Sequence, residues 1–466
     1  MSRATDIRLL DAKIGFADYL YRCPIKFGGR ALDRATVLNV ELVAETPAGK
    51  RAAGFGSMPL GNVWAWPSKT LSYHETLAAM KSLACRIARL LPDFARDEFF
   101  HPLDLGRALE QALACESESV VAELALPEPM PRLAALVASS PFDAALHDVF
   151  GKVNAFNCYA AYGPDFVSHD LSCYLDSRFA GEHLDRYTLK VPAPLMPLYH
   201  LAGALDPLTD ADVRAPVRDG LPETLEDWII RDGLTHVKIK LNGDDLAWDV
   251  SRVLAVDQVA SRIDARSGPR PWRYSLDFNE QCQSVEYLLD FLSRVSRAGQ
   301  RVFDRVQYIE QPTSRDLRAN PENKMHAAAR VKPVVIDESL LDYESLLLAA
   351  DMGYSGVALK ACKGQTQSLI LAAAAQKLGL FLCVQDLTCT GPSYLHSVSL
   401  ASRIPGVAAV EGNGRQYCPS GNEGWEGLFP SVFKLANGTI ETRVLTGPGL
   451  GCVPPDYRAP GLSACP

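Results

Sequence analysis

The chain has 466 residues, of which 47% are hydrophobic and 22% are charged, the composition of an ordinary globular protein. This length exceeds what one compact core normally holds, so we expect two domains. The net charge of −8 and the pI near 5.7 argue against nucleic acid or an anionic membrane as a partner, and no apolar stretch approaches the roughly 18 residues that cross a bilayer.

Residues 1–154 contain strand patterns followed by helix patterns, which predicts an α+β domain. Apolar and polar residues alternate in Ile7–Ile14 and Thr36–Glu45, as they do in half-buried strands. Helical periodicity follows in His74–Leu91 and Pro141–Val153. We therefore expect a sheet covered by helices in this part of the chain.

Residues 155–194 have a weak pattern with many polar and aromatic side chains, and we expect an insertion or a linker there. From 195 to 429 strand and helix patterns alternate, which predicts an α/β domain. The expected strands are Leu195–His200, His236–Leu241, Trp272–Asp277, Val306–Glu310, Val334–Asp337, Gly356–Lys360, Phe381–Gln385 and Val407–Glu411. Eight such strands favour a (β/α)8 TIM-type barrel. An open doubly wound sheet is the alternative, but neither GxGxxG nor GxxxxGKS/T occurs near its first strand.

Three acidic residues, Asp277, Glu310 and Asp337, each close a predicted strand, at intervals close to one strand–helix–strand unit. A β/α barrel places its catalytic groups at the C-terminal ends of its strands, so these carboxylates should converge. They would repel one another unless a cation lay among them, and hard cations such as Mg²⁺ bind oxygen ligands of this kind. The pattern predicts a metal-dependent barrel enzyme.

Lys238 and Lys240 lie at the end of the second predicted strand, where side chains two apart point to the same face. Two ammonium groups near each other and near a metal would each lose proton affinity, which can make a lysine a general base. Lys360 closes the sixth strand, across an eight-stranded barrel from Lys240. The pair could remove and return a proton on opposite faces of a substrate. Solvated or edge-protecting lysines are the alternative.

Taken together, these segments resemble the enolase superfamily, and most of all its muconate lactonizing enzyme branch. The motifs that carry the resemblance are Lys238-Ile239-Lys240, Asp277–Glu280, Tyr308–Pro312, Ile336–Ser339, Leu359–Gly364, Pro141–Lys152 and Thr446–Gly451. Each motif is weak alone, but the ordered set is strong and covers nearly the whole chain except the 155–194 region.

The resemblance implies a capping domain of residues 1–154, completed by 430–466, over a barrel of residues 195–429. It also implies a set of site residues: Asp277, Glu310 and Asp337 as Mg²⁺ ligands, Lys240 and Lys360 as the acid/base pair, and Lys238 as an electrostatic neighbour. The reaction shared by the family begins with removal of a proton α to a carboxylate, through an enediolate. These residues do not separate racemisation or epimerisation, which we favour, from cycloisomerisation or dehydration.

Asp386 and Glu411 close strands seven and eight, where relatives often contact substrate, and acids there could bind a cationic group such as an ammonium. Salt bridging between strand ends is an equal alternative. Asn279 and Glu338, beside the expected metal ligands, are expected either to orient those ligands or to cap strand ends. His396 is expected on a helix rather than as a base.

The connections Tyr19–Arg30 and Gly54–Trp66 are rich in glycine and aromatic residues, and we expect them to be loops that close the barrel mouth. The chain begins without the signature of a secretory signal, and its 12 cysteines lack zinc-like spacing, so we expect a cytoplasmic protein with reduced thiols. We expect a small-molecule carboxylate substrate, a homo-oligomer, and no partnership with nucleic acid or membrane.

Two other classes of function are open. A non-catalytic relative could bind a small carboxylate, but retention of three acids and two lysines argues against it. An unrelated metal-dependent barrel is the other, and a zinc hydrolase is disfavoured because only one of the eight predicted strands, Leu195–His200, ends in a histidine.

Overall fold

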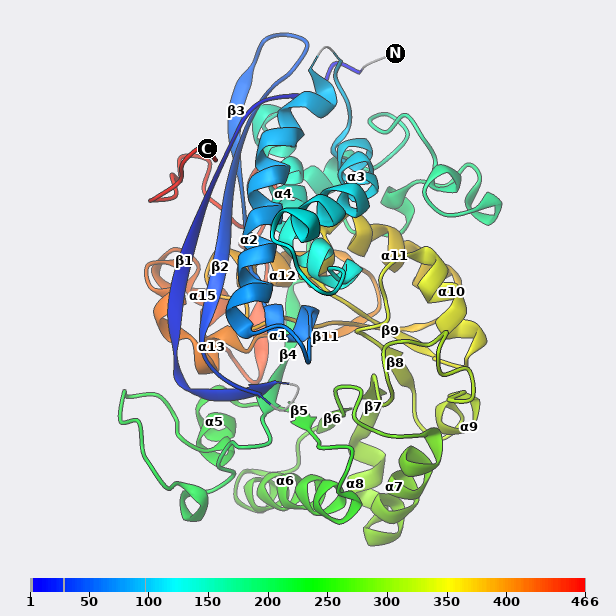
Figure 1. Cartoon of the computed structure of the whole chain (residues 1–466). Coiled ribbons are helices and arrows are strands. Elements are labelled where there is room, and N and C mark those ends of the chain that lie inside the picture. Colours follow the sequence, from blue (N-terminus) through cyan, green and yellow to red (C-terminus); the bar gives the residue numbers. More distant parts are fainter. Residues whose placement is uncertain (1–2, 28–29, 97, 466) are drawn as a thin grey trace.

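The computed structural model describes residues 3–27, 30–96 and 98–465. Within the described N-terminal part, the antiparallel strands β1 (Arg8–Phe27), β2 (Arg30–Glu45) and β3 (Arg51–Pro59) form a sheet in the order β1-β2-β3. Figure 1 shows these long strands beside the helices of the cap, with the barrel strands below them. The expected strands and helices of the first domain are therefore present.

The expectation of two glycine-rich loops is wrong. Residues 19–27 continue β1 in extended conformation, and residues 28 and 29 lie outside the described part of the chain. Gly54 and Gly56 lie within β3, where a Cβ would come within 2.2 Å of Val149 N and 1.9 Å of Pro141 O. These glycines permit close packing of a strand on a helix rather than a mobile loop. Only the end of the expected segment leaves the sheet, as the short helix α1 (Asn62–Ala65).

The cap helices are α2 (Tyr73–Leu90), α3 (Pro102–Glu123) and α4 (Arg132–Val153). Ser72 and Glu75 form a capping box that begins α2. Nearly every residue of α4 is buried, because this helix packs against the sheet on one side and the barrel on the other. Helix α4 also begins before Pro141, which lies inside it.

The described segment 155–194 consists of the 3₁₀ turns η2 (Cys158–Ala161), η3 (Leu171–Cys173), η4 (Ser177–Phe179) and η5 (Leu184–Arg186). Leu171, Phe179 and Leu184 are buried in the main core. Other apolar side chains along the segment, from Cys158 to Tyr187, are buried in the same core, so the segment packs against the rest of the protein over much of its length.

Within residues 98–465, eight parallel strands close into a barrel, which confirms the predicted fold class. They are β4 (Leu195–Ala202), β5 (His236–Lys240), β6 (Arg273–Asp277), β7 (Val306–Glu310), β8 (Val334–Ile336), β9 (Gly356–Leu359), β10 (Phe381–Val384) and β11 (Val407–Glu411). Closure comes from the pairing of β11 with β4 through Val410 with Leu198 and Glu411 with Tyr199. Each strand agrees with a predicted one to within two residues.

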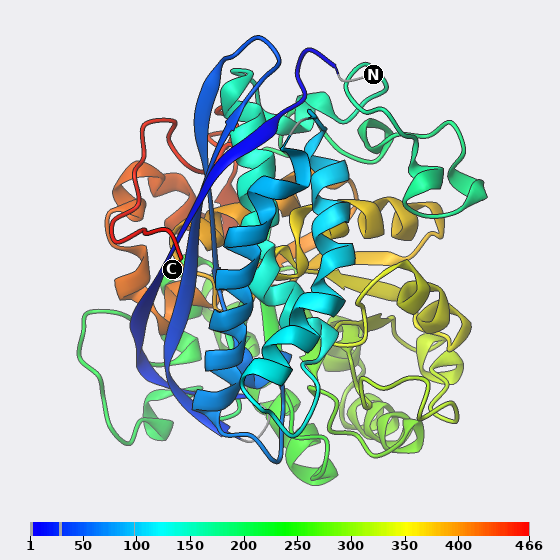
Figure 2. The ribbon, with the colours of Figure 1, turned by 45° about the horizontal axis from the view of Figure 1, so that its top comes forward.

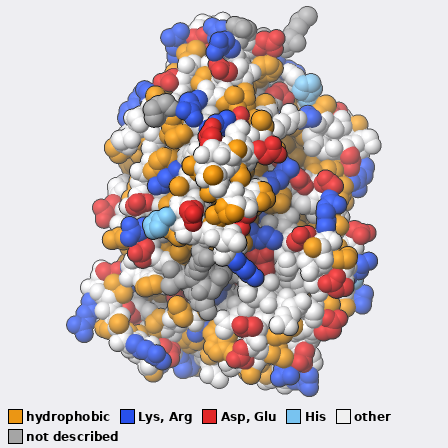
Figure 3. Space-filling view, viewed as in Figure 1, with side chains coloured by type: hydrophobic (Ala, Val, Ile, Leu, Met, Phe, Trp, Pro, Cys, Tyr) orange, Lys and Arg blue, Asp and Glu red, His pale blue; other side chains and the backbone are white. Residues whose placement is uncertain are grey.

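Helices surround the barrel on its outer face. They are α5 (Leu225–Asp232), α6 (Leu246–Ser267), α7 (Val285–Ala298), α8 (Gln300–Arg305), α9 (His326–Ala329), α10 (Tyr343–Asp351), α11 (Gln365–Lys377), α12 (Pro392–Arg403), α13 (Gly414–Tyr417), α14 (Trp425–Leu428) and α15 (Pro430–Phe433). None of the helices in the described part of the chain has the length and apolar character needed to span a bilayer. Acidic and basic side chains are interspersed over the face shown in Figure 3.

The C-terminal segment contacts both parts of the molecule. Strand β12 (Thr439–Glu441) pairs antiparallel with β4. Further on, the Leu450 backbone N–H donates to Asp148 Oδ1 of α4 at 3.1 Å. The end of the chain thus joins the barrel to the cap.

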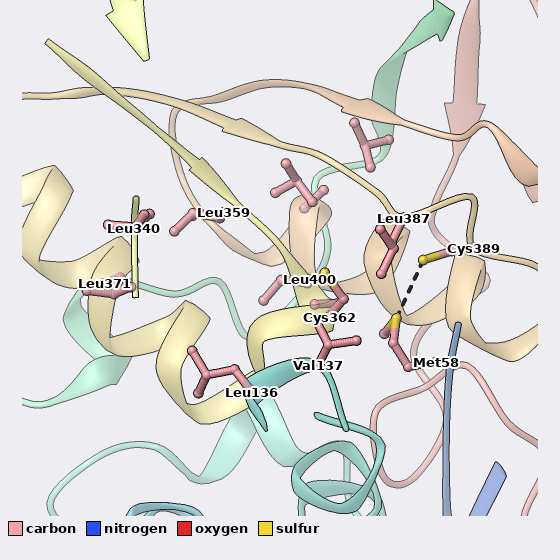
Figure 4. Close-up of a cluster of buried hydrophobic side chains, with 14 of the residues drawn as sticks. Met58, Leu136, Val137, Leu340, Leu359, Cys362, Leu371, Leu387, Cys389 and Leu400 are labelled. Atoms are coloured by element: carbon pink, nitrogen blue, oxygen red, sulfur yellow. Dashed lines mark hydrogen bonds between the residues drawn. The ribbon is translucent and has the colours of Figure 1, made fainter. Parts of the chain in front are cut away.

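An apolar cluster holds the cap on the barrel. Figure 4 shows Met58 of β3 and Val137 of α4 beside Cys362, Leu387 and Cys389 of the barrel. The Cys389 thiol donates to Met58 Sδ at 3.6 Å. Cys362 and Leu387 belong to the loops that follow β9 and β10, so this packing fixes the cap over the C-terminal ends of the strands.

Candidate active site

The carboxylates of Asp277, Glu310 and Asp337 follow one another at the C-terminal ends of β6, β7 and β8. Asp277 is in register with Glu310, and all three residues are at most 1% exposed. Burial without compensation would strongly disfavour three negative charges at this rim. The structure supplies positive charge from four buried lysines.

Lys238 occupies the centre of this arrangement. Its Nζ lies 2.8 Å from Glu310 Oε1, 3.0 Å from Asp277 Oδ2 and 3.2 Å from Glu411 Oε2, and it also donates to Gln385 Oε1. Burial disfavours the ammonium, but the surrounding carboxylates outweigh it and raise the pKa of Lys238 well above its ordinary value. Lys238 therefore neutralises the interior of the site.

Lys240 and Lys360 flank the row of acids. Lys240 Nζ lies 2.5 Å from Asp277 Oδ2 and 2.7 Å from Asn279 Oδ1. Lys360 Nζ lies 2.9 Å from Asp337 Oδ2. Their strands, β5 and β9, are four places apart in the ring of eight, so the lysines approach from opposite sides of the barrel.

The loss of proton affinity expected for Lys238 and Lys240 beside a bound metal stays a prediction. Burial lowers the proton affinity of Lys360, yet the nearby Asp337 carboxylate dominates and raises the pKa of that lysine above its ordinary value. Carboxylates, rather than neighbouring lysines, set the electrostatics of this rim.

Lys363, the fourth lysine, is 3% exposed and lies 3.2 Å from Asp337 Oδ1. It also donates to the backbone oxygen of Asp337. Burial disfavours the Asp337 carboxylate, but Lys360 and Lys363 outweigh it and lower the pKa of Asp337 to about 2. Lys363 thus holds this acid ionised and in place.

A divalent cation fits the donor set, although no group of three acidic, imidazole or thiol side chains in the described residues is already arranged around a metal position. Ammonium groups bind the carboxylate oxygens instead. Among the described atoms Glu310 Oε2 is buried and lacks a hydrogen-bond partner. Burial, and then the charges of Asp277 and Asp337, raise the pKa of Glu310 well above its ordinary value. The positive charge near these carboxylates is therefore incomplete. Mg²⁺ binds carboxylate oxygens of this kind and would supply the missing charge.

Asn279 contacts the expected ligand Asp277, and Glu338 contacts Asn279. The Asn279 backbone N–H donates to Asp277 Oδ1 at 2.8 Å, and its side-chain amide donates to Glu338 Oε1 at 3.2 Å. Burial, followed by the charge of Asp337, raises the pKa of Glu338 to about 7. These contacts suit a role for Asn279 in orienting Asp277, whereas in the described part of the chain Glu338 contacts Asn279 and not the acids.

The turns after three strand ends are strained. Asn279, Gln311 and Thr388 have positive φ angles of 43°, 31° and 56° without being glycine. Each such residue costs on the order of 1–3 kcal/mol, and strain of this kind clusters at functional sites.

Asp386 and Glu411 lie at the same rim but are engaged with the protein. The Asp386 carboxylate accepts backbone N–H groups of Thr388, Cys389 and Asn413 at 2.9–3.3 Å. Glu411 accepts from Lys238 and from the Asn413 amide. These contacts correspond to one of the two alternatives for Asp386 and Glu411, bridging between neighbouring strand ends. Their role in substrate binding stays a prediction. His396 lies on α12, as predicted, with Nε2 2.8 Å from Gln365 Oε1.

The cap contributes Trp64, which is 7% exposed. Its indole N–H donates to Glu338 Oε1 at 2.9 Å, and Lys360 Nζ lies 4.3 Å from the centre of its ring. The Trp64 backbone oxygen accepts from Arg315, whose guanidinium forms a bidentate pair with Glu280. Sequence reasoning missed Arg315 because no strand-end pattern marks it.

A cavity of about 310 Å³ opens beside this contact, between cap and barrel. Its lining includes Trp64, Trp66, Asn279, Arg315 and Glu338. Its size suits a small molecule.

The chain matches the family described as "Enolase C-terminal domain-like" over residues 220–457. Similar solved structures include the L-Ala-D/L-Glu epimerase from Bacillus subtilis, at 14% identity and a TM-score of 0.62, covering 96% of this chain and 99% of that one. A dipeptide epimerase from Enterococcus faecalis, complexed with Mg and a dipeptide, has 14% identity and a TM-score of 0.59, with coverage of 95% and 99%. A 2-chloromuconate cycloisomerase from Rhodococcus opacus has 16% identity and a TM-score of 0.57, with coverage of 95% and 96%. These three similarities show a shared fold. No curated protein matches the chain.

Proposed function

The chain belongs to the enolase superfamily, and from this premise we propose that it is an Mg²⁺-dependent enzyme that removes a proton α to a carboxylate. We favour a racemase or epimerase, or another isomerase, acting on a small carboxylate. The observation that carries the proposal is the placement of Lys240 and Lys360 on opposite sides of the acids at the barrel rim.

Two lysines on opposite sides permit proton transfer at one carbon. One Nζ would accept the α-proton on its face, and the other would return a proton on the opposite face. Asn279 would position Lys240, because its side-chain oxygen accepts from that ammonium at 2.7 Å. Trp64 would position Lys360 and exclude water from its side of the site.

Asp277, Glu310 and Asp337 would hold the Mg²⁺ ion. When bound, the ion would supply positive charge beside the substrate carboxylate as negative charge develops there. Support comes from the buried, partnerless Glu310 Oε2 among the described atoms, and from the Mg in the similar dipeptide epimerase structure. Lys238 would neutralise the charge on the Asp277 and Glu310 oxygens that its ammonium group contacts.

A lyase-type reaction, cycloisomerisation or dehydration, is the second candidate, and the cycloisomerase among the similar structures favours it. In that case one lysine would transfer the proton and the other would stabilise charge. Asp386 and Glu411 would face a cationic substrate group only after giving up contacts that they make now.

The test is incubation with Mg²⁺ in D₂O and a library of small carboxylates, followed by mass spectrometry and NMR. Deuterium at the α-carbon with inversion supports a racemase or epimerase, and loss of water or ring closure supports a lyase. The matched control is the Lys240→Ala/Lys360→Ala double variant. A protein that binds Mg²⁺ and carboxylates but exchanges no α-proton would be a binding relative, and the proposal of catalysis would fail.

A further inference from the structure

The last described residues of the chain lie on the outer strand of the cap. Ile14 of β1 and Ser463 exchange both backbone hydrogen bonds, at 2.9 and 3.0 Å. A Cβ on Gly15 would lie 2.8 Å from the backbone oxygen of Gly461, so the tail crosses β1 in close contact. In Figure 2 the C-terminal end, coloured red, lies beside the long blue strands. The tail is thus an additional short strand segment on β1.

One face of α2 is directed at the part of β1 that the tail crosses. Lys81, Cys85 and Arg89 are four residues apart on this helix and therefore share a face. Lys81 Nζ lies 5.0 Å from the centre of the Phe16 ring, and Phe16 follows Gly15 in β1. Cys85, one turn further along α2, is half-buried at the edge of the core.

The tail brings a second thiol to this face. Cys465, two residues after Ser463, is also half-buried, and its thiol is hydrogen-bonded to that of Cys85. The positive charge of Arg89 acts on the Cys465 thiol. Two thiols in contact beside a cation, at the edge of the core, are the arrangement that oxidation to a disulfide requires.

We propose that Cys85 and Cys465 are a redox-sensitive modification site, at which a peroxide converts the thiol pair into a disulfide that ties the C-terminal tail to α2. The Cys85 thiolate attacks the peroxide oxygen, which gives a sulfenic acid and expels hydroxide. The Cys465 sulfur then attacks the Cys85 sulfur and water leaves. Overall, two thiols and one hydrogen peroxide give one disulfide and two waters.

The order of attack follows from the surroundings of the two sulfurs. Burial, and then the hydrogen bond to the Cys85 thiol, raise the pKa of Cys465 to about 12. A raised pKa keeps Cys465 in its thiol form, so we assign the first attack to Cys85 and the resolving step to Cys465. The bond would close a loop of about 380 residues (465 − 85), and in the chain-entropy description long loops of this kind constrain an unfolded chain most. None of the lysines or acids at the barrel rim takes part, so the outcome is independent of the proposed catalysis.

Peptide mapping tests the proposal. Reduced protein is treated under native conditions with hydrogen peroxide, blocked with an alkylating agent and digested with trypsin without reduction. Cleavage after Lys81, Arg86 and Arg458 releases Ser82–Arg86 and Ala459–Pro466. We expect these peptides linked, at the sum of their masses less two hydrogens, and separated again by dithiothreitol. The oxidised protein should also melt at a higher temperature than the reduced protein.

Matched variants define the site. Cys85→Ser and Cys465→Ser should each abolish the linked peptide and the rise in melting temperature. Cys173→Ser should change neither, because Cys173 is exposed on the 3₁₀ turn η3 and not on α2 or the tail. The wild-type map decides the matter even where a variant folds poorly. Peroxide that oxidises Cys115 and Cys173 while Cys85 and Cys465 stay unlinked, or that takes Cys85 only to the sulfinic acid, would overturn the proposal.

Discussion

Lys360 Nζ lies 4.3 Å from the centre of the Trp64 ring, so a side chain of the cap contacts a lysine at the rim of the barrel. The same indole donates to Glu338, which follows β8, while Lys360 follows β9. One residue of the short helix α1 therefore bridges two neighbouring strand ends. The cap is part of the site as well as its cover.

Trp64→Ala should lower turnover of any substrate found in the deuterium screen by about tenfold or more. Lys360 would lose a cation–π contact worth about 0.5–2 kcal/mol, and Glu338 would lose a buried donor worth about 1–3 kcal/mol. Trp64→Phe keeps the ring and should lose less. Steady-state kinetics on both variants measure the effect, and calorimetry should find Mg²⁺ affinity nearly constant. Wild-type turnover in Trp64→Ala would show that the contact is only packing.

Asp277→Asn, Glu310→Gln and Asp337→Asn should each weaken Mg²⁺ binding by at least about 100-fold, since loss of an outer contact alone typically costs 10–100-fold. Isothermal titration calorimetry measures the affinity, and circular dichroism checks the fold. Glu344→Gln is the control, because Glu344 is an exposed acid at the start of α10. Unchanged affinity in any of the three would remove that residue from the proposed ligand set.

The barrel could be predicted from the sequence because each of its strands is a short apolar run that ends at a charged or polar residue. Val306–Glu310 and Val407–Glu411 agree with the observed strands at both ends. The ordered motifs also identified the enolase superfamily, and the family match confirms that resemblance. The C-terminal ends of the strands could be predicted because charged or polar residues that the site requires mark them. No such residues mark the ends of the helices.

Contacts that depend on the radius of the barrel or on docking of the cap could not be predicted. Sequence spacing put Lys238 and Lys240 on one face, but it did not show that Lys238 reaches across to Glu411 and Gln385. Gly54 and Gly56 lie in a strand that closely approaches a helix, whereas glycine more often marks a loop, so the sequence pattern alone predicts a loop there.

The pH dependence of stability should change in Asp143→Asn. The Asp143 carboxylate accepts from Thr366 N and Thr366 Oγ1 at 2.7 Å, and burial raises its pKa to about 6. The folded protein binds the Asp143 proton more tightly than the unfolded chain does, so ionisation of Asp143 destabilises the folded state. This destabilisation is absent below about pH 4, grows between pH 4 and 6, and is constant above pH 6. The shift corresponds to about 2–3 kcal/mol.

Urea unfolding of both proteins at pH 4, 5, 6 and 7 measures that effect. The stability of the wild type relative to Asp143→Asn should fall across the lower part of this range and then level off. A difference that is the same at all four values would mean that Asp143 titrates alike in the folded and unfolded chain.

Lys240→Ala and Lys360→Ala should each lower turnover by about 10²–10⁴-fold, the range that one positioned acid or base supplies. If the reaction is a racemisation or epimerisation, each single variant should still exchange the α-proton of one stereoisomer, because the surviving lysine still reaches its own face. NMR of deuterium incorporation, run separately on each isomer, distinguishes the two faces. Lys13→Ala is the control, since Lys13 pairs with Asp11 on the surface of the cap. Undiminished turnover in either variant would exclude that lysine from proton transfer, and Lys363, which is buried against the same Asp337, would be the next residue to replace.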